Sequence, residues 1–158
     1  MLQDLALIFK LNNGVVRTAL DGLPQDDFWR RPEAGGNPIG WMLGHITGSR
    51  YNLLNRLGDP AKTGWGNIFA RGMPLAEVET YPSREALLAA WKDTHPRMRD
   101  AFASVSAETL AEKLGRKIGP LDDPTVGETV TFLAFHEAYH AGQMGYVRRL
   151  LGHSGVAG

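Results

Sequence analysis

Two histidines near the carboxyl end of the chain have the spacing of a metal-binding pair. His136 and His140 stand in the segment His-Glu-Ala-Tyr-His. In a helix, side chains four residues apart project from the same face, one turn apart. Imidazole is the commonest nitrogen ligand for metals in proteins. His45, far upstream, could supply a third imidazole from another helix. Three histidines with one position left for water or substrate are typical of a reactive metal site.

The alternative to a metal site is three separate histidines, each hydrogen-bonded to a carbonyl or hydroxyl group. Steps of three and four residues place His136 and His140 on the same stripe as Leu133 and Val147, which we expect to face the core. A buried polar group without a partner costs about 1–3 kcal/mol. A shared ion would satisfy several ring nitrogens at once. We therefore favour a metal site made by His45, His136 and His140.

The same segment also matches H-E-x-x-H, in which Glu137 would be the general base of a zinc protease. The extended form of that motif would need glycine at 143 and histidine at 146, where this chain has Gln143 and Tyr146. No acidic residue follows His140, so a downstream glutamate ligand is missing. A compact metalloprotease therefore ranks below the other hypotheses. Glu137 and Gln143 remain candidate catalytic residues that could orient a ligand or an imidazole.

Several other residues could take part in the site or could be structural. His95, beside Pro96, could be a fourth ligand, but packing in the core is the commoner role for such a residue. We expect His153 to be solvated, and Arg148 and Arg149 to complement the dipole at a helix end. Five aromatic residues could line a pocket above the metal or belong to the core: Trp41, Trp65, Phe69, Trp91 and Tyr139.

Four segments with helical hydrophobic periodicity must position these residues. The first is predicted over 2–21, and the second begins with Asn37 as N-cap and Pro38 in the first turn and runs to about 57. Ser83 caps a third, which carries Pro96 and a predicted kink. Residues 106–114 form a short helix. The pair Thr125 and Glu128 forms a capping box that starts the last long helix, ending at 152.

These elements predict an all-α fold, a four-helix bundle in a single domain over 1–158. No strand-like alternation, internal repeat or low-complexity tract competes with this interpretation. Residues 58–82 form a long connection rich in glycine and proline, including Gly64 and Gly66. A loop of that length in a compact domain is commonly functional, so we expect it to shape a substrate cavity.

Composition excludes several classes of function. Seventeen basic and seventeen acidic residues give a net charge of zero, so no net field attracts nucleic acid or an anionic membrane. The absence of cysteine excludes disulfides, thiolate zinc sites and a thiol nucleophile in the protein itself. Neither a signal peptide nor a membrane span is predicted. We expect a cytoplasmic protein.

Several segments together resemble the DinB/YfiT-like metalloenzymes. The matching stretches are Asn37 to Ile46 (NPIGWMLGHI), Tyr81 to Ser83 (YPS), Thr125 to Glu128 (TVGE), His136 to Gln143 (HEAYHAGQ) and Arg148 to Gly152 (RRLLG). The spacing of the three histidines is the most specific part of this resemblance, which extends over nearly the whole chain.

The resemblance implies an up-down-down-up four-helix bundle in which His45, His136 and His140 bind a divalent metal ion, zinc or nickel ahead of iron or manganese. It also implies a homodimer. Relatives include transferases and an isomerase that use low-molecular-weight thiols, so the implied partner is a small-molecule substrate together with such a thiol. Two functions stay open: a metal-dependent transferase or hydrolase that activates a thiol or water, and a non-catalytic metal- or ligand-binding helical module.

Overall fold

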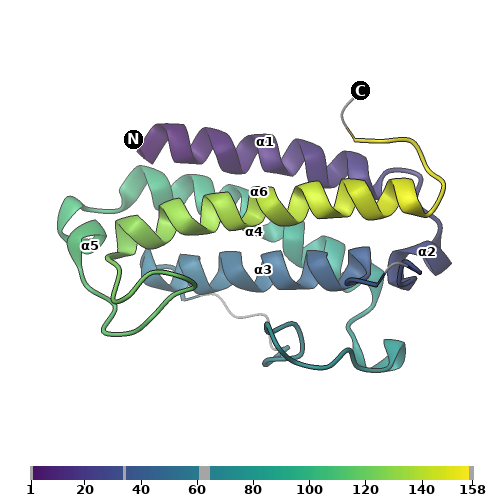
Figure 1. The fold of residues 1–158 in the computed structure, drawn as a ribbon. Helices are drawn as coiled ribbons and strands as arrows, with labels where there is room; N and C mark the ends of the chain where they lie inside the picture. The colour runs from purple at the N-terminus through teal and green to yellow at the C-terminus, as the bar shows by residue number, and fades with distance from the viewer. Residues whose placement is uncertain (1, 34, 61–64, 157–158) are drawn as a thin grey trace.

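Four long helices lie side by side in the computed structural model, which describes residues 2–33, 35–60 and 65–156 (Figure 1). They are α1 (Leu2–Leu20), α3 (Ile39–Arg56), α4 (Arg84–Ser104) and α6 (Val126–Leu150). Their connections contain the short helices α2 (Gln25–Trp29) and α5 (Ala107–Ala111) and the 3₁₀ turn η1 (Val78–Thr80). The described residues include two isolated β-bridges and no strand, so the all-α prediction is confirmed.

The chain direction of the four helices follows the predicted up-down-down-up order. In Figure 1, α1 and α6 run one way and α3 and α4 run the other way. Helix α6 packs against α1 on one side and α3 on the other, and α4 contacts both α3 and α1. Helices α3 and α6, which carry the three candidate ligands, are therefore antiparallel neighbours. No helix in the described part of the chain is long and apolar enough to cross a membrane.

Local sequence signals set most helix ends. The predicted capping box is present, since the Thr125 hydroxyl accepts from the Glu128 backbone N–H and the Glu128 carboxylate accepts from the Thr125 N–H. Ser83 caps α4, which continues through Pro96, and the kink there stays a prediction. The predicted start of α3 is wrong by one residue. Pro38 is the N-cap, because its ψ of 156° is extended and its carbonyl accepts the first helical hydrogen bond, from Met42.

Helix α2 was not predicted, because five residues are too few to display a helical period. Its Phe28 side chain is fully buried against the start of α3. There Gly40 lies so close that a Cβ atom would be 2.6 Å from the Phe28 ring. This contact packs α2 against the first turn of α3.

The long connection between α3 and α4 follows from the topology. Because these two helices are neighbours with the same direction, the chain must return along the whole length of α3, about 27 Å for 18 residues. Residues 61–64 of this connection, Gly64 among them, lie outside the described residues. The following part packs on α3 through Phe69, whose ring is buried and stacks on Tyr81 with centroids 5.1 Å apart.

We predict that Gly44 is required for this packing. A Cβ atom at Gly44 would lie 2.5 Å from the Phe69 ring, so Gly44→Ala should displace the connection and destabilise the protein by about 1–3 kcal/mol. Gly48→Ala, one turn further along α3, is the control, because an added Cβ there meets no atom within 4 Å. Both substitutions replace glycine by alanine within α3, so the gain in helix propensity is the same for both variants. Urea unfolding of the two variants should therefore separate them, and equal stabilities would contradict the contact.

Candidate metal centre

The three predicted ligands meet between α3 and α6. His45 Nε2 lies 3.0 Å from His136 Nε2, and His140 Nε2 lies 3.2 Å from the same atom. One ring nitrogen from each histidine lies within 4.8 Å of the other two. Two nitrogens bound to one tetrahedral zinc ion at 2.0–2.1 Å are roughly 3.3 Å apart. The observed separations therefore match a shared ion to within a few tenths of an ångström.

In His45 and His140, Nδ1 points away from the cluster and Nε2 points into it. The hydrogen bond made by Nδ1 determines whether Nε2 carries a lone pair. His45 Nδ1 donates to the backbone carbonyl of Phe69 at 2.7 Å, and a carbonyl can only accept. His140 Nδ1 contacts the side-chain oxygen of Gln143 at 2.8 Å, while the Gln143 amide nitrogen donates to the Tyr139 hydroxyl. In a neutral imidazole with a protonated Nδ1, Nε2 bears a lone pair. Both Nε2 lone pairs therefore face His136.

His136 cannot satisfy this arrangement alone. Its Nε2 could donate one proton to only one of the two neighbouring lone pairs, and its buried Nδ1 has no partner among the described residues. A cation at the centre accepts all three Nε2 lone pairs at once. The donor set, three imidazoles without a thiolate or carboxylate, is one that zinc, nickel, copper and iron accept. The residues present therefore fit a divalent metal.

The electrostatic environment keeps these rings ready to bind a metal. Burial lowers the pKa of His136 and His140 to about 4, helped for each by a neighbouring histidine of the cluster. Burial also lowers the pKa of His45, partly opposed by its hydrogen bond to Phe69. With their pKa values lowered in this way, the rings are neutral near pH 7, and a metal ion does not have to displace protons from them.

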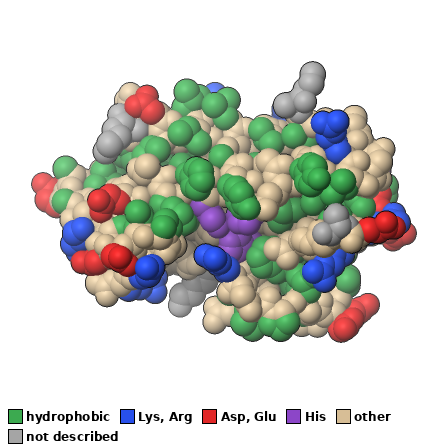
Figure 2. Space-filling model, in the orientation of Figure 1, with side chains coloured by type: hydrophobic (Ala, Val, Ile, Leu, Met, Phe, Trp, Pro, Cys, Tyr) green, Lys and Arg blue, Asp and Glu red, His purple; other side chains and the backbone are tan. Residues whose placement is uncertain are grey.

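One side of the cluster reaches the molecular surface. Histidine side chains gather at the centre of the face seen in Figure 2, over the contact between α3 and α6, and all three rings are half-buried. Trp41 stacks on His45 with ring centroids 5.0 Å apart, and Tyr139 contacts His140 edge-on. Trp65 and Phe69 contribute to the cavity beside His45. Four of the five expected aromatic residues therefore surround the cluster.

The sequence and the fold of this chain are both similar to those of known proteins. The sequence pattern of the DinB superfamily matches residues 9–144. The chain belongs to the DinB superfamily. A conserved protein from Enterococcus faecalis has a similar structure, with a TM-score of 0.71, 15% sequence identity, and coverage of 94% of this chain and 95% of that one. At that identity the likeness concerns the fold. A comparison with curated proteins finds no match.

In this DinB-superfamily protein, Glu137 faces the centre of the bundle. Its carboxylate accepts from Arg50 Nε at 2.6 Å and from Arg50 Nη2 at 2.7 Å, and both side chains are almost completely buried. Consecutive helical residues point about 100° apart, so His136 and Glu137 face different neighbours. The carboxylate is not part of the histidine cluster among the described residues. Its predicted catalytic role stays a prediction.

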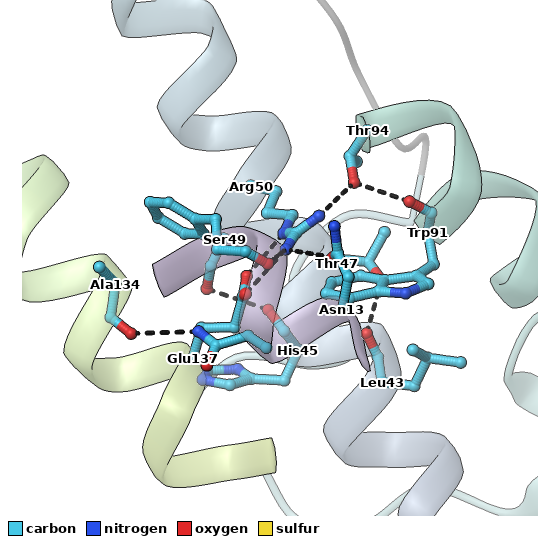
Figure 3. Close-up of polar contacts among 12 residues, drawn as sticks. Asn13, Leu43, His45, Thr47, Ser49, Arg50, Trp91, Thr94, Ala134 and Glu137 are labelled. Carbon is cyan, nitrogen blue, oxygen red and sulfur yellow. Dashed lines mark hydrogen bonds and ion pairs between the residues drawn. The ribbon is translucent and has the colours of Figure 1, made fainter. Parts of the chain in front are cut away.

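Arg50, which sequence reasoning missed, joins all four long helices (Figure 3). Besides Glu137 on α6, the guanidinium donates to Thr94 on α4 at 3.1 Å and to Asn13 on α1 at 2.7 Å. It also lies 3.9 Å from the centroid of the Trp91 ring. No sequence signal distinguished Arg50 from an exposed arginine, because an arginine in an amphipathic helix is usually solvated.

The remaining candidates take structural positions. His95 is not in the histidine cluster among the described residues; its ring contacts Trp91 edge-on, and burial lowers its pKa to about 4. Arg148 lies in the last turn of α6, and its buried guanidinium also donates to carbonyls at the end of α1. His153 is also not free in solvent, since its Nε2 lies 2.7 Å from an Asp27 carboxylate oxygen. Both contacts form where the end of α6 meets the segment that follows α1.

We predict that the buried ion pair is essential for stability. Glu137→Gln leaves the Arg50 charge buried without its counterion and should cost about 3–5 kcal/mol in urea unfolding. Asp59→Asn is the matched control, because the ion pair of Asp59 with Arg97 is much more exposed and its loss should have a much smaller effect. Equal effects of the two substitutions would show that the buried pair is not the stronger constraint.

Proposed function

We propose that this protein is a metal-dependent enzyme of the DinB superfamily that uses a low-molecular-weight thiol, as a thiol S-transferase or a related transferase or hydrolase. The main support for the proposal is that three neutral imidazoles point their Nε2 atoms at one another. This cluster lies at the molecular surface, where a substrate can reach it. A divalent metal held by His45, His136 and His140 would lower the pKa of a bound thiol or water, which supplies a nucleophile near neutral pH.

The number of converging ligands favours an enzyme over a structural metal site. Structural zinc sites are closed by four protein ligands, whereas catalytic sites keep a position open. Among the described residues, three ligands converge and neither His95 nor Glu137 joins them. The all-imidazole donor set supports zinc or nickel, with iron as an alternative, and it counts against manganese, which prefers oxygen ligands. Because the chain has no cysteine, the thiol has to come from a second molecule.

Two candidate catalytic residues have different proposed roles. Gln143 orients the His140 ring through the 2.8 Å contact at Nδ1 and is itself held by Tyr139. It therefore fixes the direction of one ligand lone pair. Glu137 is a positioning residue, because both of its oxygens are engaged by Arg50. A base for peptide hydrolysis needs a free carboxylate at the metal, so this geometry counts against the metalloprotease alternative.

We predict that the bound metal depends on the cluster. Protein purified without an affinity tag should contain about one divalent ion per chain by elemental analysis, and His136→Ala should lose most of it, because two ligands remain. His153→Ala is the control, since its ring pairs with Asp27 away from the cluster. Full metal content in His136→Ala would contradict the assignment.

A thiol should reach the metal. Protein loaded with Co²⁺ in place of the native ion should change its visible absorption when 2-mercaptoethanol is added, because a sulfur ligand alters the cobalt coordination. The same addition to Co²⁺-treated His136→Ala protein is the control and should give only the spectrum of free cobalt with thiol. An unchanged spectrum of the loaded wild-type protein with every small thiol tested would reject thiol activation.

We also propose a homodimer formed through the outer face of α6. Phe135, Tyr139 and Tyr146 are 67%, 56% and 64% exposed, at helical spacing on one stripe. Exposed large apolar side chains that are grouped in this way commonly mark an interface.

The wild-type chain should sediment at about twice 17.3 kDa, and the double substitution Phe135→Glu and Tyr146→Glu should convert it to a monomer. Val78→Glu, at an exposed site in the connection, is the control. A monomeric wild-type chain would reject the proposal.

A further inference from the structure

A polar cavity lies directly beside His45. It has a volume of about 270 Å³ and is bounded by one face of α3 and by residues 65–71 of the long connection. His45, Ser49 and Asn52 line it from the helix, and Asn67 and Arg71 line it from the connection. Because His45 is one of the three candidate ligands, a molecule in this cavity would lie against one ligand of the metal centre. The cavity is therefore the natural place for the second part of a substrate.

Small residues on α3 keep this space open. Gly48 follows His45 on the same helix and lines the cavity, and an added Cβ there would meet no atom within 4 Å. Asn52 lies one turn further on the same face. The volume equals that of about nine liquid waters at roughly 30 Å³ each, which is below the usual range for drug-sized ligands. The cavity thus suits a short metabolite and not a polypeptide.

The charge in the cavity is positive and unpaired. Arg71 is exposed, and it has no hydrogen bond or ion pair with any described residue. No aspartate or glutamate is among the described residues that line the cavity. The amides of Asn52 and Asn67 add hydrogen-bonding groups that carry no charge. Among the described residues of the lining, a molecule that enters therefore meets one cation and several neutral polar groups.

We propose that this cavity binds the carboxylate of a small anionic thiol, with Arg71 as the residue that pairs with the carboxylate while the sulfur end reaches the histidine cluster. A guanidinium group matches a carboxylate through two parallel hydrogen bonds. The one cation among the described lining residues balances one carboxylate charge, whereas a phosphate carries more charge than these residues offset. The inference rests on the proposed function and adds a substrate class and a residue that selects it.

Three thiols of similar size and different charge test this selection. They are 3-mercaptopropionate, which carries a carboxylate, 2-mercaptoethanol, which is neutral, and cysteamine, which carries an ammonium group. Each is titrated into Co²⁺-loaded protein, and the dissociation constant is obtained from the visible absorption. In the wild-type protein, 3-mercaptopropionate should bind roughly 3–10-fold more tightly than the neutral thiol, the range for a partly exposed ion pair. Cysteamine should bind most weakly.

Variants assign the effect to this cavity. Arg71→Gln should abolish the preference for the carboxylate while binding of 2-mercaptoethanol is unchanged. The three thiols also differ in their intrinsic affinity for cobalt. Dividing each dissociation constant of the variant by that of the wild type cancels this difference. Arg116→Gln removes the same charge from an exposed residue that does not line the cavity, and it should keep the preference. Gly48→Leu should fill the cavity and weaken binding of all three thiols without loss of cobalt.

The outcomes separate this inference from the proposed function. If the cobalt spectrum responds to all three thiols with equal affinity, or if Arg71→Gln keeps the preference, the inference is overturned and thiol activation stands. If no thiol alters the spectrum, the proposed function fails. Propionate is then titrated into the metal-free protein and followed by NMR. Shifts of the Asn52 and Asn67 amide signals that are absent in Arg71→Gln would support the carboxylate site, and their absence would overturn it.

Discussion

The buried ion pair between Arg50 and Glu137 is the constraint on which the rest of the structure depends. Its two charges lie in the middle of the bundle, between two apolar clusters, and each polar atom of the pair needs its partner because water does not reach it. The Arg50 guanidinium also contacts α1 and α4, so one side chain sets the relative position of all four long helices. A shift of α6 along α3 would leave a charge buried and unpaired, which makes the register of these helices specific.

That register is what brings the histidines together. Glu137 directly follows His136 on α6, and Arg50 lies five residues after His45 on α3. The ion pair and the histidine cluster are thus two contacts between the same pair of helices, one toward the core and one toward the surface. Without a cation, the cluster can form at most one hydrogen bond through His136 Nε2, so it contributes little to holding the helices together. The ion pair fixes the helix register that keeps the cluster assembled, because breaking it would leave a charge buried.

The parallel arrangement of α3 and α4 contributes the other side of the site. It forces a long connection back along α3, and this connection supplies the Phe69 carbonyl that orients His45. The same segment carries Arg71 and Asn67 along the cavity wall. One topological requirement therefore produces both the orientation of a ligand and the space beside it. Gly44 permits the close approach, because only a residue without a side chain leaves room for the Phe69 ring.

The sequence alone determined the long helices, the capping box at Thr125, and the common direction of His136 and His140, since all of these depend on residues within a few positions of one another. The sequence also offered His45 as the third ligand, and only the spacing that resembles a known family tied it to the other two. Tertiary structure alone decided that Arg50 is buried against Glu137, that Arg148 binds the end of α1, and that Phe69 orients His45. Local spacing specifies which face a side chain occupies. Only the packing of helices that are distant in sequence determines which residues lie against that face. That packing therefore determines whether a charged or imidazole side chain contacts water, a counterion or a metal.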